Sequence, residues 1–424
     1  MINTESEKKK DLLLHLKEEL DKIPTLDIDT LKIIDLSKIL RVHLPLTLLK
    51  KILIDYNGFQ KLEVEELRKL DLSEFDVTGF SLSGRDLSYT NLSIDPQKVK
   101  AKDLSYCYLN RVDLSNADFT GVNVEGATLN YTNAMIDPQK VLNKNFARID
   151  MEGNDLSGRD FTDVNICRAN LQGTRAEIDP QKVLNKNLGG TNLHGLNLRG
   201  KCFEDVEVED ANLSYTNANI DPQRVANKSF FRINMEGNDL SGKDFTNVDV
   251  HYANLSYTGA TIDPQKVVDM SFWGINMEGN DLSKKDFTGV DVHHANLSYT
   301  GADIDPQKVV DKRFTGINME GNDLSGKNFS DVNIEFATLK NTGATIDPQR
   351  IADKSFYGVN AENCDLSKAD FTDVDVSQAI LKNTGARLSK SQQETLKDYV
   401  DEDFSTTINI IKNSVSRVLR KKTN

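Results

Sequence analysis

The tripeptide Ile-Asp-Pro recurs at a constant interval of 42 residues and constrains the fold of this chain more than any other feature. It begins at Ile94, Ile136, Ile178, Ile220, Ile262, Ile304 and Ile346. A constant period is typical of tandem repeats that stack in the same pose, because an insertion would move a row of side chains out of line. We therefore expect an elongated solenoid, although 424 residues would otherwise suggest two or three closed domains.

Apolar residues within one unit recur every five positions, a spacing that fits neither the strand period of 2 nor the helix period of 3.6. Met235, Leu240, Phe245, Val250 and Leu255 show this interval. A side chain points inward at every fifth residue if four such steps make one turn of a square coil. Eight steps and a two-residue insertion account for the 42 residues of a unit, so we expect two coils per unit.

Two columns of apolar residues are predicted to stack in the core of the solenoid. The leucine column comprises Leu114, Leu156, Leu198, Leu240, Leu282, Leu324 and Leu366. The phenylalanine column comprises Phe119, Phe161, Phe203, Phe245, Phe287, Phe329 and Phe371. Successive coils would then be hydrogen-bonded like parallel strands, about 4.7–4.9 Å apart.

The five-residue pattern resembles that of the pentapeptide-repeat family, in which Ala-(Asp/Asn)-Leu is followed by two variable residues. Matching stretches begin at Ala253 (Ala-Asn-Leu-Ser-Tyr), Ala295 (Ala-Asn-Leu-Ser-Tyr) and Ala369 (Ala-Asp-Phe-Thr-Asp). The resemblance implies a mainly β fold, a right-handed quadrilateral β-solenoid. One column departs from the family pattern, because it carries basic residues where the family usually has a small inward residue: Arg159, Lys201, Lys243, Lys285 and Lys327. We expect these side chains to extend outward past the corner.

The resemblance covers residues 70–388, and two segments with helical patterning flank them. Residues 1–69 are predicted to form a small helical domain and residues 389–424 a helical cap. Such caps are expected because the end coils of a solenoid otherwise expose unpaired backbone. Pentapeptide-repeat proteins often dimerise through a C-terminal element, so a homodimer contact is the alternative interpretation of residues 389–424.

The Asp-Pro-Gln segment of each unit is predicted to form about one helical turn, because Asp is a favourable N-cap and Pro a favourable first helical residue. In one unit this turn would run from Asp263 to Val268. A basic residue follows the glutamine in every unit, which gives a basic ridge: Lys98, Lys140, Lys182, Arg224, Lys266, Lys308 and Arg350. The basic ridge is the candidate partner-binding site, and a solvated surface without a binding role is the alternative.

The sequence predicts no catalytic, cofactor-binding or metal-binding residues. His251 and His293 share a column and His294 adjoins it, but equivalent positions in neighbouring units would lie about 9.6 Å apart by the strand spacing. Zinc–nitrogen bonds are only about 2.0–2.1 Å long. The four cysteines have no motif spacing, so neither a disulfide framework nor a zinc site is expected. We expect a protein that is not an enzyme; catalysis within residues 1–70 is the alternative.

The charge of the chain lies mainly in the repeats, because residues 79–388 contain 32 basic and 44 acidic residues. No apolar run approaches the 18 or so residues of a membrane span, and no cleavable signal is evident. We therefore expect a cytoplasmic protein without membrane contact. The net charge of −13 disfavours direct binding of nucleic acid.

Two functions remain compatible with these observations. The first is a non-enzymatic scaffold that binds a protein partner. The second follows from the resemblance, since some pentapeptide-repeat proteins inhibit or protect a type II topoisomerase such as gyrase by mimicking DNA with an acidic rod. The acidic repeats favour DNA mimicry, whereas the basic ridge disfavours it.

Overall fold

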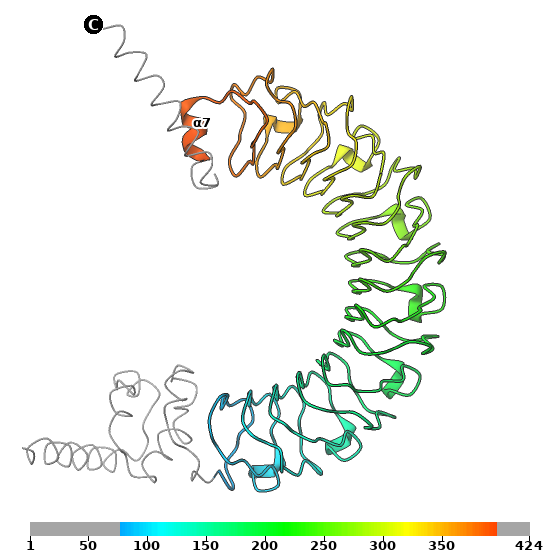
Figure 1. Ribbon diagram of the computed structural model, residues 1–424, viewed down its shortest axis with the longest axis vertical. Helices are drawn as coiled ribbons and strands as arrows, with labels where there is room; N and C mark the ends of the chain where they lie inside the picture. Colours follow the sequence, from blue (N-terminus) through cyan, green and yellow to red (C-terminus); the bar gives the residue numbers. More distant parts are fainter. Residues whose placement is uncertain (1–76, 397–424) are drawn as a thin grey trace, which may run out of the picture. The chain divides into compact units, whose positions relative to one another are not determined.

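The structure, a computed structural model, describes residues 77–396, which fall into two compact units. Unit 1 ends at Cys202 and unit 2 begins at Phe203. In each unit the chain winds into coils that stack on one another (Figure 1). The predicted helical domain, residues 1–69, and most of the predicted cap, residues 389–424, lie outside the described residues.

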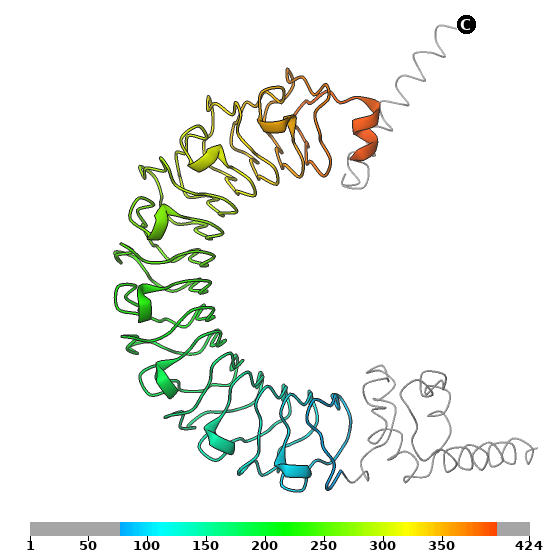
Figure 2. The same ribbon diagram turned by 180° about the vertical axis from the view of Figure 1, so that it is seen from behind.

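The helices of the described residues are short. Unit 1 contains the 3₁₀ helices η2 (Lys100–Lys102), η3 (Leu142–Lys144) and η4 (Leu184–Lys186). Unit 2 contains η5 (Ala226–Lys228), η6 (Val268–Met270), η7 (Val310–Lys312), η8 (Ala352–Lys354) and the α-helix α7 (Lys390–Thr395). Within each unit the 3₁₀ helices follow one another along one side of the coils (Figure 1, Figure 2).

Successive coils are joined by isolated parallel bridges. Asn234 pairs with Asn254, and Asn254 pairs with Asn276. The paired residues are alternately 20 and 22 positions apart, and these two lengths together span the sequence period of 42 residues. The coils therefore alternate between a shorter and a longer form.

Hydrogen-bonded turns recur at five-residue intervals and form the corners of the coils. Ile275 N donates to Phe272 O at 3.1 Å, and Asn280 N donates to Met277 O at 3.0 Å. A 20-residue coil accommodates four such steps, so it has four sides and four corners.

The interior of both units is built from the inward residues of these steps. Every member of the leucine and phenylalanine columns is buried, with a relative exposure of at most 5%. A second phenylalanine packs edge-on against the phenylalanine column, as in the pair Phe272 and Phe287, whose ring centroids lie 5.9 Å apart. The basic residues in the column that departs from the family pattern are only partly buried, and Lys327 forms an ion pair with Asp303.

A few polar side chains are buried between coils and are fully hydrogen-bonded. Asn280 is 2% exposed, and its Nδ2 donates to Leu255 O at 2.7 Å and to Met277 O at 3.0 Å. Cys364 occupies the corresponding position of a later unit, and its Sγ donates to Leu339 O at 3.1 Å. These contacts satisfy carbonyl groups that burial would otherwise leave without donors.

The Asp-Pro-Gln segment forms a single turn that is shorter than the predicted helical turn from Asp263 to Val268. A single turn is closed by the hydrogen bond from Lys266 N to Asp263 O at 3.0 Å, and Val267 is then extended, with φ −73° and ψ 166°. η6 starts only at Val268. The prediction was wrong in its extent, because Val267 is extended and is a core residue, 4% exposed.

The glutamine side chain of the Asp-Pro-Gln segment forms hydrogen bonds to the backbone of the next coil. Gln265 Nε2 donates to Asp286 O at 3.2 Å and to Thr288 O at 2.7 Å. The same double contact is made by Gln97, Gln139, Gln223, Gln307 and Gln349. The side of the coil that carries this segment is called the ridge side below.

At the C-terminal end of unit 2, α7 takes the place of an Asp-Pro-Gln segment. Ser389 caps α7 and forms a capping box with Gln392. Gln392 Nε2 donates to Phe371 O at 2.8 Å and to Val374 O at 3.0 Å. A glutamine amide thus ties α7 to the last coil as it ties the coils to one another.

Candidate functional site

One side of the coils in unit 2 carries a ladder of asparagine amides and is called the ladder side. Asn254 Nδ2 donates to Asn234 Oδ1 at 3.0 Å, and Asn276 and Asn296 continue the series at 2.9 Å each. The stacked amides add side-chain hydrogen bonds to the backbone ladder at this point. The position of the outward groups on this side is therefore well fixed.

The ladder side lies opposite the ridge side. Two corners separate Asn276, on the ladder side, from Asp286, whose carbonyl accepts a hydrogen bond from Gln265 on the ridge side. Because a coil has four corners, two corners lead to the opposite side. A partner bound to the ladder side would therefore not touch the basic ridge.

Tyrosine rings line one corner of the ladder side, and each lies on a glycine of the next coil. A Cβ atom on Gly279 would lie 2.6 Å from Cδ1 and Cε1 of Tyr257. The Tyr257 hydroxyl donates to Glu278 Oε1 at 2.5 Å, and this hydrogen bond raises the pKa of Tyr257. Tyr299 lies over Gly321 in the same way.

The same arrangement recurs in both units. Its tyrosine–glutamate pairs are Tyr131 with Glu152, Tyr215 with Glu236, Tyr257 with Glu278 and Tyr299 with Glu320. The glycine after each glutamate makes room for the ring, and the glutamate anchors the hydroxyl. Each ring is thereby held at the surface in one orientation.

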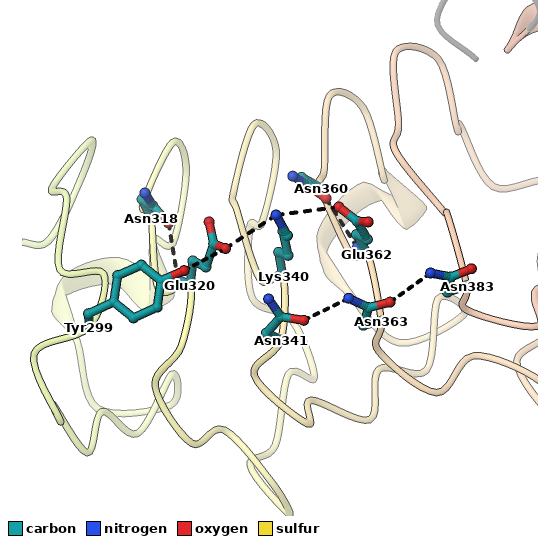
Figure 3. Close-up of polar contacts among 9 residues, drawn as sticks. All are labelled: Tyr299, Asn318, Glu320, Lys340, Asn341, Asn360, Glu362, Asn363 and Asn383. Atoms are coloured by element: carbon teal, nitrogen blue, oxygen red, sulfur yellow. Dashed lines mark hydrogen bonds and ion pairs between the residues drawn. The ribbon is translucent and has the colours of Figure 1, made fainter. Parts of the chain in front are cut away.

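The last units replace the Ser-Tyr pair with Lys-Asn (Figure 3). Lys340 Nζ lies 3.3 Å from Glu320 Oε1 and 3.6 Å from Glu362 Oε2, and its hydrogen bond to Glu320 raises the pKa of Lys340. Asn341 stands where a tyrosine would, and Asn363 where a glycine would. These two amides bond to each other at 2.7 Å and thus continue the series of side-chain contacts.

Aromatic rings also line the other corner of the ladder side in unit 2. Tyr252 and Trp273 have ring centroids 5.1 Å apart, and Phe336 and Tyr357 lie 4.9 Å apart. Tyr252 lies over Gly274 as Tyr257 lies over Gly279. Both corners of this side are therefore aromatic.

The exposed aromatic side chains of residues 203–396 gather on these two corners. We define the aromatic face as Tyr215, Tyr252, Tyr257, Trp273, Tyr299 and Phe336, which are 39–58% exposed. An exposed cluster of large aromatic side chains along one side of a molecule is typical of an interaction surface.

A family comparison agrees with this geometry. The model of pentapeptide repeats matches the sequence in eight copies, at residues 103–133 and 355–390. The chain thus contains pentapeptide repeats. Its fold is accordingly the right-handed β-helix solenoid of that family, as the resemblance of the sequence implied.

Solved pentapeptide-repeat structures are similar to this chain only at low identity. Trypsin-treated QnrB1, a plasmid-mediated fluoroquinolone resistance protein, is 18% identical, with 56% of this chain and 89% of QnrB1 covered and a TM-score of 0.22. HetL of the cyanobacterium Nostoc, involved in heterocyst differentiation regulation, is 19% identical, with 71% and 80% covered and a TM-score of 0.11. Because both TM-scores are low, no function is transferred from these structures. No curated protein matches the sequence.

The basic ridge predicted from the pentapeptide repeats lies on the ridge side, and most of its cations are paired within their own turn. Lys266 Nζ lies 3.4 Å from Asp263 Oδ2, and Lys308 forms the same contact with Asp305 at 3.7 Å. Lys98, Lys140 and Lys182 pair likewise. Arg224 pairs instead with Glu204 at 2.7 Å. Partner binding by the basic ridge stays a prediction.

Three histidines, His251, His293 and His294, adjoin the aromatic face. His293 stacks on His294 with ring centroids 4.1 Å apart, and Trp273 lies 6.2 Å from His293. Partial burial, the neighbouring His294 and Arg313 lower the pKa of His293. Within residues 77–396 no group of three or more metal-ligating side chains is close enough to hold an ion.

Aspartates outside the ladder side are expected to make the fold sensitive to acid. The pKa of Asp281 is lowered by hydrogen bonds from the Ser283 hydroxyl and backbone N–H. The equivalent aspartates with a lowered pKa are Asp113, Asp118, Asp155, Asp160, Asp239, Asp244, Asp286, Asp323, Asp365 and Asp370. Their stabilising effect is present above the ordinary pKa of 3.8 and is lost as the pH falls through the lowered pKa, because the unfolded chain then binds more protons.

We therefore expect the thermal unfolding midpoint, followed by circular dichroism, to fall as the pH is lowered from about 4 to about 2, below the ordinary Asp pKa. The variant Asp239→Asn/Asp281→Asn/Asp323→Asn should show a smaller fall, since the amide oxygen still accepts the turn hydrogen bond but does not titrate. An equal fall in both proteins would contradict the assignment to these aspartates.

Proposed function

We propose that the chain is a non-enzymatic interaction scaffold that binds a protein partner through the aromatic face. The observation that carries the proposal is the gathering of six exposed aromatic side chains along the two corners of one side of unit 2. Tyr and Trp are the residues most often found as energetic anchors of protein interfaces. A surface of this kind suits a partner with complementary aromatic or cationic groups.

The tyrosines of the aromatic face are already held in place before a partner binds. Tyr257 is 58% exposed, yet its hydroxyl is bonded to Glu278 and its ring lies on Gly279. Immobilising a flexible side chain at an interface costs about 0.5–1.5 kcal/mol. Most of that cost is absent for these tyrosines. Binding by the tyrosines of the aromatic face is therefore favoured over binding by the long lysines of the basic ridge.

Capture of partners from the native host by the purified chain tests the proposal. The variant Tyr257→Ser/Tyr299→Ser/Phe336→Ser should lose the proteins that the unmodified chain retains in quantitative mass spectrometry. The matched control Lys266→Ser/Lys308→Ser/Arg350→Ser alters three residues of the basic ridge in the same coils and should retain them. Loss in the control and retention in the aromatic variant would assign binding to the basic ridge instead.

Modulation of a type II topoisomerase by DNA mimicry is the second candidate function. It is favoured by exposed aspartates such as Asp239, Asp281 and Asp323, whose lowered pKa keeps them ionised. A supercoiling assay with purified gyrase tests it, and replacement of these three residues by Asn should remove the effect. Unchanged supercoiling at micromolar protein would dismiss this function.

A cytoplasmic location belongs to the proposal. It is supported by the four cysteines, all of them free, of which Cys202 is exposed. Among residues 77–396 there is no helix with the length and apolar character of a membrane span.

A further inference from the structure

A row of glutamates runs along the ladder side of unit 2 on alternate coils. Its members are Glu236, Glu278, Glu320 and Glu362. Between the last two lies a cation of the chain itself, because Lys340 Nζ is within 3.6 Å of both carboxylates (Figure 3). Lys340 shows that the space between two glutamates of this row accommodates a cation.

The two preceding intervals of the row lack such a lysine. Ser256 and Ser298 stand where Lys340 does, and within residues 203–396 no lysine or arginine forms an ion pair with Glu236 or Glu278. Each interval instead holds a tyrosine ring. Tyr257 bonds to Glu278, and the charge of Glu236 also acts on it.

An exposed ring between two carboxylates is a favourable place for a cation. The ring face attracts an ammonium or guanidinium group by about 0.5–1 kcal/mol at exposed sites. The two carboxylates also attract the cation. The excess of acidic residues in residues 79–388 attracts cations over the rest of the surface. A neutral or acidic partner would gain neither contribution.

The spacing of the row selects the conformation of the partner. Glutamates on alternate coils are about 9.6 Å apart along the solenoid, which is twice the strand spacing. Three residues of a polyproline II segment span about 9.3 Å, and its three residues per turn place every third side chain on one face. An extended segment lying along the ladder side therefore meets successive intervals with every third residue.

We propose that the partner presents an extended basic segment, with Lys or Arg at every third position, to the row formed by Tyr257, Tyr299 and their flanking glutamates. This inference depends on the proposed function, since it identifies the partner of the aromatic face. Lys340 marks the C-terminal end of the binding row, because it fills the next interval. The segment thus occupies the intervals from Glu236 to Glu320.

Fluorescence anisotropy with labelled peptides and the full chain tests the inference. The probe (Arg-Pro-Pro)₄ carries arginines at the required interval, and (Arg-Pro-Pro-Pro)₄ carries the same charge at a longer one. The first should bind about tenfold more tightly, since two correctly placed cation–ring contacts are each worth a factor of about 2–5. Equal affinities would overturn the inference.

Charge-matched variants distinguish binding by the glutamate row from general attraction of the basic peptide to the acidic chain. Glu236→Gln/Glu278→Gln keeps an acceptor for the tyrosine hydroxyls and should weaken the first peptide about tenfold. Asp239→Asn/Asp281→Asn removes the same charge from the neighbouring side and should leave its affinity within about twofold. Equal weakening by both variants would overturn the inference. If neither peptide binds while host proteins are still captured through the tyrosines, the inference fails and the proposed function stands.

Discussion

Phe272→Ala is expected to lower the free energy of unfolding by about 3–5 kcal/mol. Phe272 is fully buried and packs edge-on against Phe287, with ring centroids 5.9 Å apart. The coils are fixed at their spacing by the backbone ladder and by the Gln265 amide, so they cannot close around the cavity left by the ring. Urea unfolding followed by circular dichroism measures the change.

Trp273→Ala is the control for this variant because the two residues are adjacent in sequence but point in opposite directions. Trp273 is 39% exposed on the aromatic face. Its removal should cost no more than about 1 kcal/mol, since no core cavity forms. A similar loss of stability in both variants would contradict the inward and outward assignment of these positions.

The core was predictable from the sequence because each inward residue is repeated many times at one interval. Leu240 and Phe245 belong to columns in which every member is apolar and buried. A five-residue interval keeps all of these side chains inside when four such steps make one coil, as the 20-residue spacing of the bridges shows. Repetition therefore compensates for the weak signal of any single unit.

The conformation of the Asp-Pro-Gln segment was not predictable from local rules. Asp263 and Pro264 are favourable residues for the start of a helix, and Asp263 does accept a hydrogen bond from Gln265 N at 3.1 Å. The core requirement at Val267 overrides the helical preference, so the chain makes one turn and becomes extended. The role of Gln265 also depends on the next coil, 21 to 23 residues away, and local sequence carries no sign of it.

The aromatic face was missed because its contacts join residues on different coils. Tyr257 and Gly279 are 22 positions apart, and their contact is evident only when the length of that coil is known. A signal was present in the regular recurrence of Ser-Tyr in one coil and Glu-Gly in the next. The prediction favoured the basic ridge because its charges are visible in the sequence, whereas their pairing with aspartates such as Asp263 is not.

Gly279→Ala is expected to lower the free energy of unfolding by roughly 2–4 kcal/mol, the sum of a backbone and a packing effect. Gly279 has φ +72°, a conformation that costs other residues about 1–2 kcal/mol. The new Cβ would also meet the Tyr257 ring at 2.6 Å and displace it from Glu278. Urea unfolding gives the loss of stability, and the fluorescence of the displaced tyrosine reports the movement.

Gly289→Ala isolates the backbone effect, because Gly289 has the same φ of +72° and nothing within 4 Å of the added Cβ. It should cost only about 1–2 kcal/mol. Tyr257→Ser removes the ring, so Gly279→Ala introduced into that background should cost no more than Gly289→Ala does. The two substitutions at 257 and 279 would then be coupled by at least about 1 kcal/mol. Additive effects would show that the position of the Tyr257 ring does not depend on Gly279. The tyrosines of the aromatic face would then not be held rigidly for binding.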